Sequence, residues 1–180
     1  MNNQKNHNQY TFLKSSWLTT TRGSMLAIAS KEALYLLEFA GRRDLEQIIK
    51  DLTTKTNATI LPGRTRQIDS IEHEINAYFA GSLKEFKTPI HLSGSPFQQD
   101  VWHTLMSVPY GNTISYSEQA IAMGKQSTAC RAVANANGAN HLAIIIPCHR
   151  IINTNGNLGG YGGGIAHKQW LIDLEKKNRT

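Results

Sequence analysis

The sequence predicts an α/β fold in two parts, an N-terminal α/β domain over residues 1–92 and a mainly helical domain over residues 93–180. Two observations lead to this prediction. Between residues 25 and 79, short apolar runs typical of strands alternate with segments whose apolar residues recur at helical spacing. Between residues 96 and 138, three helical segments are separated by turns that contain glycine. A chain of 180 residues is long enough for one ordinary domain or two small ones.

The elements of the N-terminal part follow from their apolar patterns and their stop signals. Two apolar runs around Lys31-Glu32 are typical of a β-hairpin. Two helices are expected where Leu and Ile recur every three or four residues, and the short strand between them ends at Pro62-Gly63. In chain order, the predicted elements are strands 25–30 and 33–39, helix 43–55, strand 59–61 and helix 68–79.

The C-terminal part follows a predicted linker at residues 89–96. Its first helix has Pro96 in the first turn, where the missing N–H costs nothing. Two further helices joined by a tight turn at Gly124 suggest a helix-turn-helix, although this pattern is common in helical proteins. The remaining predicted elements are a buried strand at 142–146 and a last helix whose buried stripe is Ala166, Trp170, Leu171 and Leu174.

Composition excludes several classes of protein. An apolar content of 40% and a sparse charged content of 18% are not those of a disordered chain. Only two cysteines are present, Cys130 and Cys148, which excludes a disulfide framework or a cysteine-rich zinc module. No apolar stretch could cross a membrane, and the polar start MNNQKNHNQYTF lacks a signal-peptide core. We therefore expect a soluble protein of a reducing compartment. Its net charge of +6 permits a nucleic-acid partner without establishing one.

The helix predicted at 127–138 has an unusual outward face. Arg131 is the only formally charged residue between Lys125 and Arg150, and its neighbours on that face are Thr, Ala and Asn. A face exposed to solvent normally carries several charges. Small residues with one arginine suit close approach to another surface, such as a nucleic-acid groove. The pattern is equally compatible with a face packed against the rest of the protein. The opposite, buried side is predicted to carry Cys130, Val133, Ala134 and Asn137.

Cys148 and His149 directly follow Pro147, which ends the predicted strand. A thiol must lose its proton to act as a nucleophile, and a nearby histidine or cation lowers its pKa. Adjacent residues on an extended chain point to opposite faces, so this pair needs a turn or a bridging water to communicate. Taken alone, the dipeptide is more often a buried structural cysteine beside a surface histidine. A standard zinc cage is excluded because no suitably spaced partners exist.

Several motifs together resemble the O6-alkylguanine-DNA alkyltransferases, also called methylated-DNA–protein-cysteine methyltransferases. The resemblance is specific over residues 93–180 and weaker at 25–39 and 75–81. The active-site signature is IPCHRI at 146–151. The motifs that accompany it are SPFQQ (95–99), VPYGNTISY (108–116), CRAV (130–133), GAN (138–140), GYGGG (160–164) and KQWL (168–171).

The resemblance implies a fold and a reaction. The N-terminal domain is expected to be ribonuclease-H-like, and the C-terminal domain winged-helix-like with a helix-turn-helix. Cys148 is expected to accept the alkyl group of O6-alkylguanine in one displacement, and His149 to remove the thiol proton through a water. Glu175 would orient His149, and Asn140 would stabilise the turn next to the thiol. Residues alone would place Glu175 on a solvated helix end. The thioether product is stable, so the protein would act once, with no cofactor and no metal.

The resemblance also implies double-stranded DNA as the partner, approached through the minor groove by a monomer. The target base lies inside the duplex and must be flipped out. Arg131 would fill the vacated place, and Tyr116 would crowd the target phosphate and donate a hydrogen bond to the leaving guanine, with Ser117 also at the DNA. The substrate pocket would include Ile151, Tyr161 and Gly162.

Four departures from the family pattern matter, one of which is that no cysteine precedes Cys130. His141 replaces the usual proline after the asparagine, Gly162 stands where some members carry a hydroxyl residue, and Gln169 replaces a glutamate. Two alternatives remain, a lesion-binding protein without transfer activity and a Cys-His hydrolase. Lesion-binding proteins of this kind normally lack the acceptor cysteine, and no hydrolase motif accompanies the Cys148-His149 pair. The absence of a Lys/Arg-rich tract favours a bacterial cytoplasm; a eukaryotic member would be nuclear.

Overall fold

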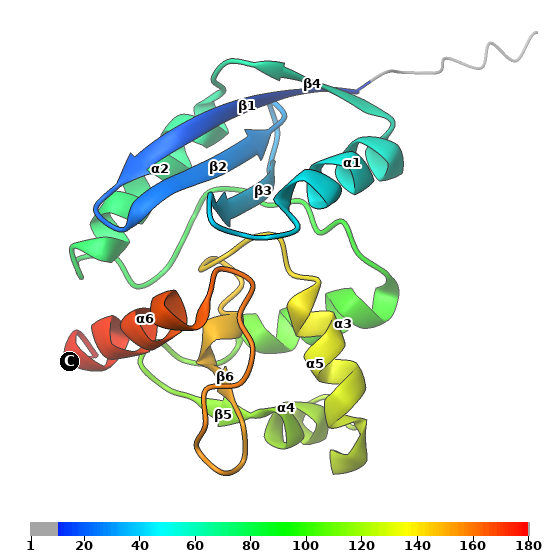
Figure 1. Cartoon of the computed structure of the whole chain (residues 1–180), viewed down its shortest axis with the longest axis vertical. Helices are drawn as coiled ribbons and strands as arrows, with labels where there is room; N and C mark the ends of the chain where they lie inside the picture. The colour runs from blue at the N-terminus through cyan, green and yellow to red at the C-terminus, as the bar shows by residue number, and fades with distance from the viewer. Residues whose placement is uncertain (1–10, 180) are drawn as a thin grey trace, which may run out of the picture.

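The computed structural model describes residues 11–179. It places a four-stranded sheet with two helices above a group of four helices, as Figure 1 shows. The polar segment that lacks a signal-peptide core lies almost entirely at residues 1–10, outside the described residues. None of the helices within residues 11–179 has the length and apolar character that a membrane crossing needs.

The sheet contains the predicted hairpin and one strand that the sequence pattern did not reveal. Its order is β3-β2-β1-β4, with β4 parallel to β1 and the other pairs antiparallel. The strands are β1 (Thr11–Thr20), β2 (Gly23–Ala29), β3 (Leu34–Phe39) and β4 (Ala58–Pro62). Strand β1 does not show the alternation of apolar and polar residues typical of a strand, because some of its apolar residues are buried and others are exposed. Leu13 and Leu18 are fully buried, whereas Phe12 and Trp17 are 62% and 55% exposed.

Two helices, α1 (Leu45–Thr56) and α2 (Arg66–Phe79), pack on the sheet as predicted. Helix α1 buries Leu45, Ile48 and Leu52 in a small cluster with residues of β1, β2 and β3. Helix α2 contributes Ile68, Ile71, Ile75, Tyr78 and Phe79 to the larger core, which continues into the C-terminal half. The N-terminal end of α2 is capped by the Thr65 hydroxyl, which accepts from the backbone N–H of Ile68.

The C-terminal half consists of short helices held by local caps. Ser95 and Ser115 each form a capping box, at the starts of α3 and α4. Gly124, with φ of 69°, makes the turn after α4. In chain order, the elements are α3 (Pro96–Met106), β5 (Ile114–Ser115), α4 (Tyr116–Ala122), η1 (Ser127–Ala129), α5 (Cys130–Gly138), η2 (Cys148–Arg150), β6 (Ile151–Ile152) and α6 (Ile165–Lys177).

Residues 142–146 do not form the predicted strand. The backbone turns at Ile144, whose φ is 74°. The Asn140 side chain stabilises this turn, because its Oδ1 accepts from the Leu142 N–H and its Nδ2 donates to the Ile146 carbonyl, both at 2.9 Å. The segment is nevertheless buried, so the apolar run predicted burial correctly and the backbone conformation wrongly.

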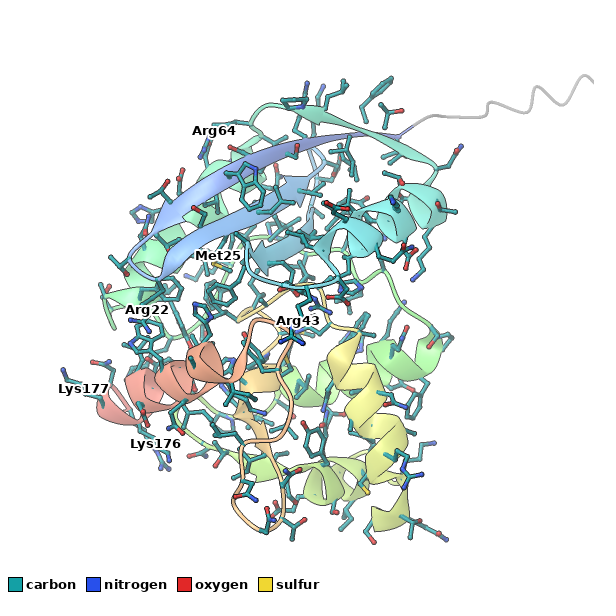
Figure 2. The ribbon with its side chains drawn as sticks, viewed as in Figure 1. Arg22, Met25, Arg43, Arg64, Lys176 and Lys177 are labelled. Atoms are coloured by element: carbon teal, nitrogen blue, oxygen red, sulfur yellow. The ribbon has the colours of Figure 1, made fainter. Side chains whose placement is uncertain are left out.

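The two halves of the chain share backbone hydrogen bonds along the edge strand β3. Leu34 exchanges bonds with residues 89 and 91, and Leu37 exchanges bonds with residues 141 and 143. The predicted linker at 89–96 is therefore partly tied to the sheet, and the edge is covered by the segment that precedes Cys148. Arg22 from the β1–β2 turn also reaches α6, where its guanidinium lies 4.3 Å from the Trp170 ring; Figure 2 labels it there. The domain boundary at residue 92 stays a prediction.

Two predicted helix faces need correction. In α5, Val133 and Asn137 are buried as predicted, but Ala136 is buried in place of Ala134 and Cys130, which are half-buried. In α6, Leu171 is buried, whereas Ala166 is exposed and Trp170 and Leu174 are half-buried. The face that α6 buries carries Lys168, Leu171, Ile172 and Glu175. The pattern failed here because two charged residues find partners inside the protein.

Candidate active site around Cys148

Cys148 begins the single turn η2 and lies half-buried in a cavity of about 230 Å³. Three segments far apart in the sequence form the walls: the start of α4, the second half of α5, and the loop before α6. Because Cys148 and His149 lie in the turn η2 and not in an extended strand, their side chains are not forced to opposite faces. The cavity is lined by Tyr116, Ala134, Asn135, Asn137, Gly138, Cys148, Gly160, Tyr161 and Gly162.

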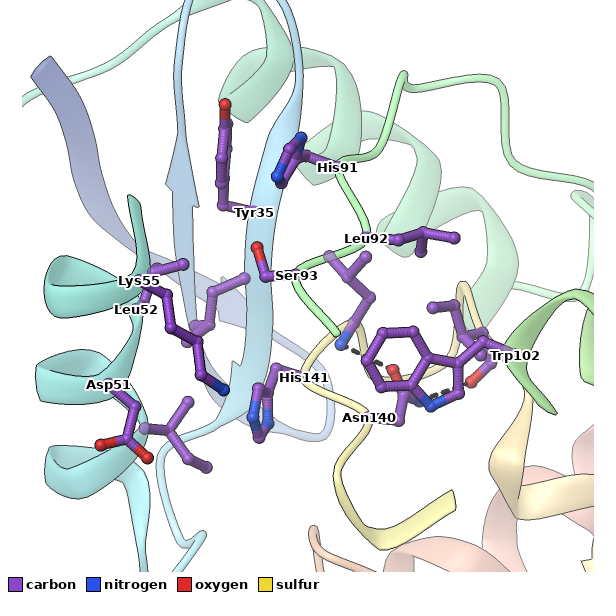
Figure 3. Close-up of a pocket in the computed structure, with 14 residues that line it drawn as sticks. Tyr35, Asp51, Leu52, Lys55, His91, Leu92, Ser93, Trp102, Asn140 and His141 are labelled. Carbon is purple, nitrogen blue, oxygen red and sulfur yellow. Dashed lines mark hydrogen bonds between the residues drawn. The ribbon is translucent and has the colours of Figure 1, made fainter. Parts of the chain in front are cut away.

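The Asn140 side chain donates a hydrogen bond to the Cys148 thiol. Asn140 is 2% exposed, and the same Nδ2 that donates to Ile146 lies 3.3 Å from the Cys148 Sγ. The other face of this segment borders a smaller cavity between α1 and α3, where Figure 3 shows Asn140 beside His141. His141, one of the departures from the family pattern, therefore faces Asp51 and Lys55 of α1 and not the thiol.

His149 is fully buried and oriented by Glu175. Its Nε2 lies 2.9 Å from Glu175 Oε1. Its Nδ1 is buried and has no hydrogen-bond partner among the residues that the structure describes. One ring nitrogen is thus held by a carboxylate, and the other is free to bind a water. A histidine placed in this way can take a proton from a neighbouring group through that water.

Glu175 is the centre of a buried polar cluster, not the solvated acid that its sequence context suggests. It is 1% exposed. Besides His149, it accepts from the Tyr78 hydroxyl at 2.6 Å, from the Gly111 N–H at 2.9 Å, and from both Nε and Nη2 of Arg150. Charge-assisted bonds of this kind offset the cost of burying a carboxylate. Tyr78 belongs to α2, so the N-terminal half helps to position the acid.

The environment sets distinct protonation states for the three groups. Burial raises the pKa of Glu175, but the bonds from His149 and Arg150 outweigh it and hold that pKa well below its usual range. Burial lowers the pKa of His149, against the attraction of Glu175. Burial raises the pKa of Cys148 to about 11, only partly opposed by the Asn140 hydrogen bond. At neutral pH the resting site therefore holds a carboxylate, a neutral imidazole and a neutral thiol, and the thiol needs a base before it can react.

The other residues singled out in the sequence lie in different relations to the cavity. Tyr116, Tyr161 and Gly162 line it. Ser117 is half-buried on α4 beside Tyr116 and outside the cavity lining. Ile151 is fully buried, also outside the lining, and its carbonyl accepts from Lys168 Nζ. The contact between the Ile151 backbone and a bound base stays a prediction.

The outward face of α5 is exposed, which decides between the two readings of its small residues. Thr128 in η1 and Arg131, Ala132 and Asn135 in α5 are exposed, whereas Ala139, just after α5, is half-buried; most of this face therefore does not pack against the rest of the protein. Asn135 and Gly138 also line the cavity. The cavity thus opens beside a helix face that is small, polar and marked by one arginine.

Two side chains of the site were not assigned a role from the sequence. Arg150 bonds Glu175 and the Val108 carbonyl. Lys168 is fully buried, and its Nζ donates to the carbonyls of Ile151, Leu158 and Gly160, so that it holds the cavity loop. One signal could have identified Lys168: it lies seven residues before Glu175, on the same helical face. Among residues 11–179, no group of three or more His, Cys, Asp or Glu could hold a metal ion.

Comparison with known proteins agrees with this arrangement. Residues 96–177 match the family model described as 6-O-methylguanine DNA methyltransferase, DNA binding domain. The methylated-DNA–protein-cysteine methyltransferase of Mycolicibacterium paratuberculosis is 42% identical over 145 residues, covering 79% of this chain and 87% of the relative. That of Mycobacterium tuberculosis is 53% identical over 103 residues, covering 57% of this chain and 62% of the relative.

Solved structures extend the likeness to nearly the whole chain. The crystal structure of the M. tuberculosis O6-methylguanine methyltransferase has a TM-score of 0.77 at 37% identity and covers 92% of this chain and 94% of its own. The M. tuberculosis protein OGT in complex with DNA has a TM-score of 0.75 at 38% identity, covering 93% and 94%. The α/β fold is confirmed by these matches. The chain belongs to the methylated-DNA–protein-cysteine methyltransferase family.

Proposed function

We propose that this protein repairs O6-alkylguanine in DNA by transferring the alkyl group irreversibly to its own Cys148. The observation that carries the proposal is the position of the thiol. It lies in a cavity that opens beside an exposed helix face of small residues, and the next residue, His149, is buried and paired with Glu175. The M. tuberculosis relative solved in complex with DNA supports DNA as the partner.

The reaction needs one nucleophile, one base and one donor to the leaving group. His149 takes the thiol proton through a water at its free Nδ1, and Glu175 stabilises the resulting imidazolium. The Cys148 sulfur then forms a bond to the alkyl carbon as the bond from that carbon to guanine O6 breaks. Tyr116, in the cavity wall, donates a hydrogen bond to the guanine as it leaves. The thioether is not hydrolysed, so each protein molecule acts once and needs no cofactor.

Access to the lesion requires the base to leave the duplex, at a cost of a few kcal/mol. The exposed face of α5 enters the minor groove, where its small residues permit close approach. Arg131 occupies the place that the base vacates, and Ser117 contacts the backbone. The flipped base then lies between Tyr116 and the loop at Tyr161 and Gly162. A monomer suffices for this geometry.

The same proposal includes the finer description of the fold and the setting of the protein. The sheet with α1 and α2 is a ribonuclease-H-like domain, and the C-terminal half is a winged-helix-like domain in which α4 and α5 form the helix-turn-helix. Repair of genomic DNA places the protein in a bacterial cytoplasm, or in the nucleus if the organism is eukaryotic. O4-alkylthymine is a second candidate substrate because it presents the same alkyl–oxygen bond.

Intact mass after incubation with DNA tests the function. With a duplex containing one O6-methylguanine, we expect a single methyl-sized gain on the protein and an unmodified guanine in the DNA. The matched duplex with guanine should leave the mass unchanged. Tight binding without a mass change would favour a lesion-binding protein instead. Hydrolysis of ester or amide substrates, without transfer, would favour a Cys-His hydrolase.

Arg131→Ala should separate repair of duplex DNA from the chemistry at Cys148. Without the side chain that fills the stack, transfer from duplex should slow by about tenfold or more, because flipping costs a few kcal/mol. Transfer from free O6-benzylguanine should change little. The measurement is the second-order rate with each substrate. Lys31→Ala, which removes the same charge from an exposed turn between β2 and β3, is the matched control. Equal losses on both substrates would reject the role of Arg131.

A further inference from the structure

Arg42 links the N-terminal half of the chain to the walls of the Cys148 cavity. It lies between β3 and α1, is only 8% exposed, and its neighbour Arg43 is labelled at the junction of the two halves in Figure 2. Its Nη1 donates to the Asn140 carbonyl at 2.9 Å and its Nη2 to the Gly138 carbonyl at 3.0 Å. Gly138 is the last residue of α5 and lines the cavity. One side chain thus holds the end of the helix proposed to contact DNA.

The guanidinium is itself fixed by two acids. Glu38, on β3 and 1% exposed, accepts from Nη1, and Asp44 accepts from Nε at 2.9 Å. Glu38 is thus paired within the core, which offsets the cost of burying the arginine. A lysine could not replace this residue, because its single ammonium lacks the planar fork that reaches two carbonyls and two acids at once.

The opposite cavity wall meets the same guanidinium at Gly162. A Cβ added at Gly162 would lie 2.6 Å from Arg42 Nη1 and 2.9 Å from its Cζ. The backbone of Gly162 is not in the left-handed region, so its conformation would accept other residues. The arginine cannot swing away at low cost because four hydrogen-bonding groups hold it. Glycine is therefore required at 162 by Arg42 and not by the local backbone.

We propose that Arg42, oriented by Glu38, is a positioning residue that sets the width of the alkyl-acceptor cavity by holding the end of α5 against the loop at Gly162. This inference rests on the proposed function and assigns the N-terminal half a part in it. It also accounts for the glycine that stands where other members carry a hydroxyl residue. A bulkier side chain at 162 and Arg42 compete for one space.

A double-mutant cycle on the full-length protein tests this competition. Gly162→Ser alone should lower the second-order rate of methyl transfer from duplex by about tenfold, as expected for contacting residues and a misplaced cavity wall. Arg42→Ala alone should also lower the rate, because the wall loses its support. In the Arg42→Ala background, Gly162→Ser should cost about threefold or less, since the collision is gone. Additive effects of the two changes would overturn the proposal.

Gly160→Ser is the matched control for the cycle. Gly160 lines the same cavity, has no positive φ, and has nothing within 4 Å of an added Cβ. Its effect should be the same with Arg42 present or absent.

The ratio of rates for O6-benzylguanine and O6-methylguanine should rise in Arg42→Ala, because a loosened wall admits the larger group. An unchanged ratio in a folded Arg42→Ala protein would contradict control of cavity width.

A second variant at position 42 and a reaction of Cys148 that needs no DNA complete the test. If Arg42→Ala does not fold, as judged by urea denaturation, Arg42→Gln takes its place, because a shorter neutral side chain still leaves the space at Gly162. Failure of the proposed function is recognised separately by carboxamidomethylation of Cys148 with iodoacetamide in a Cys130→Ser background. That reaction needs neither DNA nor alkyl transfer, and the same coupling between positions 42 and 162 should appear in its rate. Absence of coupling there as well would refute the inference whatever the wild-type protein does to DNA.

Discussion

Replacing Cys148 with alanine is expected to abolish alkyl uptake completely while leaving the protein folded. The side chain is half-buried in an open cavity, and its only hydrogen bond in the described residues comes from the Asn140 amide. Its removal deletes the nucleophile and leaves one Asn140 amide hydrogen without a partner, while the other hydrogen on the same nitrogen still bonds the Ile146 carbonyl. The stability loss should therefore be small. Intact mass after incubation with an O6-methylguanine duplex measures the uptake.

Cys130→Ser provides the matched control for this change. Cys130 is the other cysteine of the chain, half-buried at the start of α5 and outside the cavity lining. The serine variant should gain the methyl group as the wild type does, and peptide mapping should locate it on Cys148. A methylated Cys148→Ala protein would mean that another residue accepts the alkyl group, and the proposed mechanism would fail.

Glu175→Gln is expected to weaken both the fold and the reaction. The amide retains the shape of the carboxylate but loses the charge that Arg150 and His149 bond. Breaking a buried charge pair typically costs about 3 kcal/mol or more of unfolding free energy. The imidazolium that forms during transfer also loses its stabilisation, so the thiol gives up its proton less readily, transfer should slow, and the apparent pKa of Cys148 should rise. Urea denaturation and the pH profile of transfer measure the two effects.

The stability that the Glu175 carboxylate contributes should depend on pH. The pKa of Glu175 in the folded protein lies below the value of about 4.3 expected for an unfolded chain. Its contribution is therefore complete above that unfolded value and is lost as the pH falls through the folded one. The stability difference between wild type and Glu175→Gln should be large at pH 7 and shrink under acid conditions.

Asp173→Asn is the matched control on the same helix. Asp173 is exposed and accepts a hydrogen bond from Gln169 within α6 at 2.9 Å. An exposed interaction of this kind is worth at most about 1 kcal/mol, and its loss should leave the pH profile of transfer unchanged. If Glu175→Gln behaves like Asp173→Asn in both measurements, Glu175 has no part in orienting His149.

Much of the secondary structure could be predicted because it depends on local patterns. The hairpin, α1, α2 and the helices of the C-terminal half follow from apolar spacing and from stop signals such as Pro62-Gly63 and Gly124. Strand β1 could not be predicted in this way, because its outward Phe12 and Trp17 obscure the alternation. The strand predicted at residues 142–146 is wrong because a β-branched run indicates that a segment is buried and does not specify its backbone conformation. The turn at Ile144 depends on the Asn140 side chain, which no periodicity reveals.

The sequence by itself was enough to predict Cys148 as the reactive residue and to name its neighbours, since the motif at 146–151 and those around it are contiguous and specific. It could not determine the surroundings of Glu175, Lys168 and Arg42, because a charged residue in a helix or loop is read as exposed until its partners are known. The partners of Lys168 lie 8 to 17 residues away, whereas Glu175 and Arg42 also bind groups of the other half of the molecule, up to 98 residues away in the chain. Only the tertiary structure brings them together, and the low-polarity interior then holds each charge by hydrogen bonds that water would otherwise weaken.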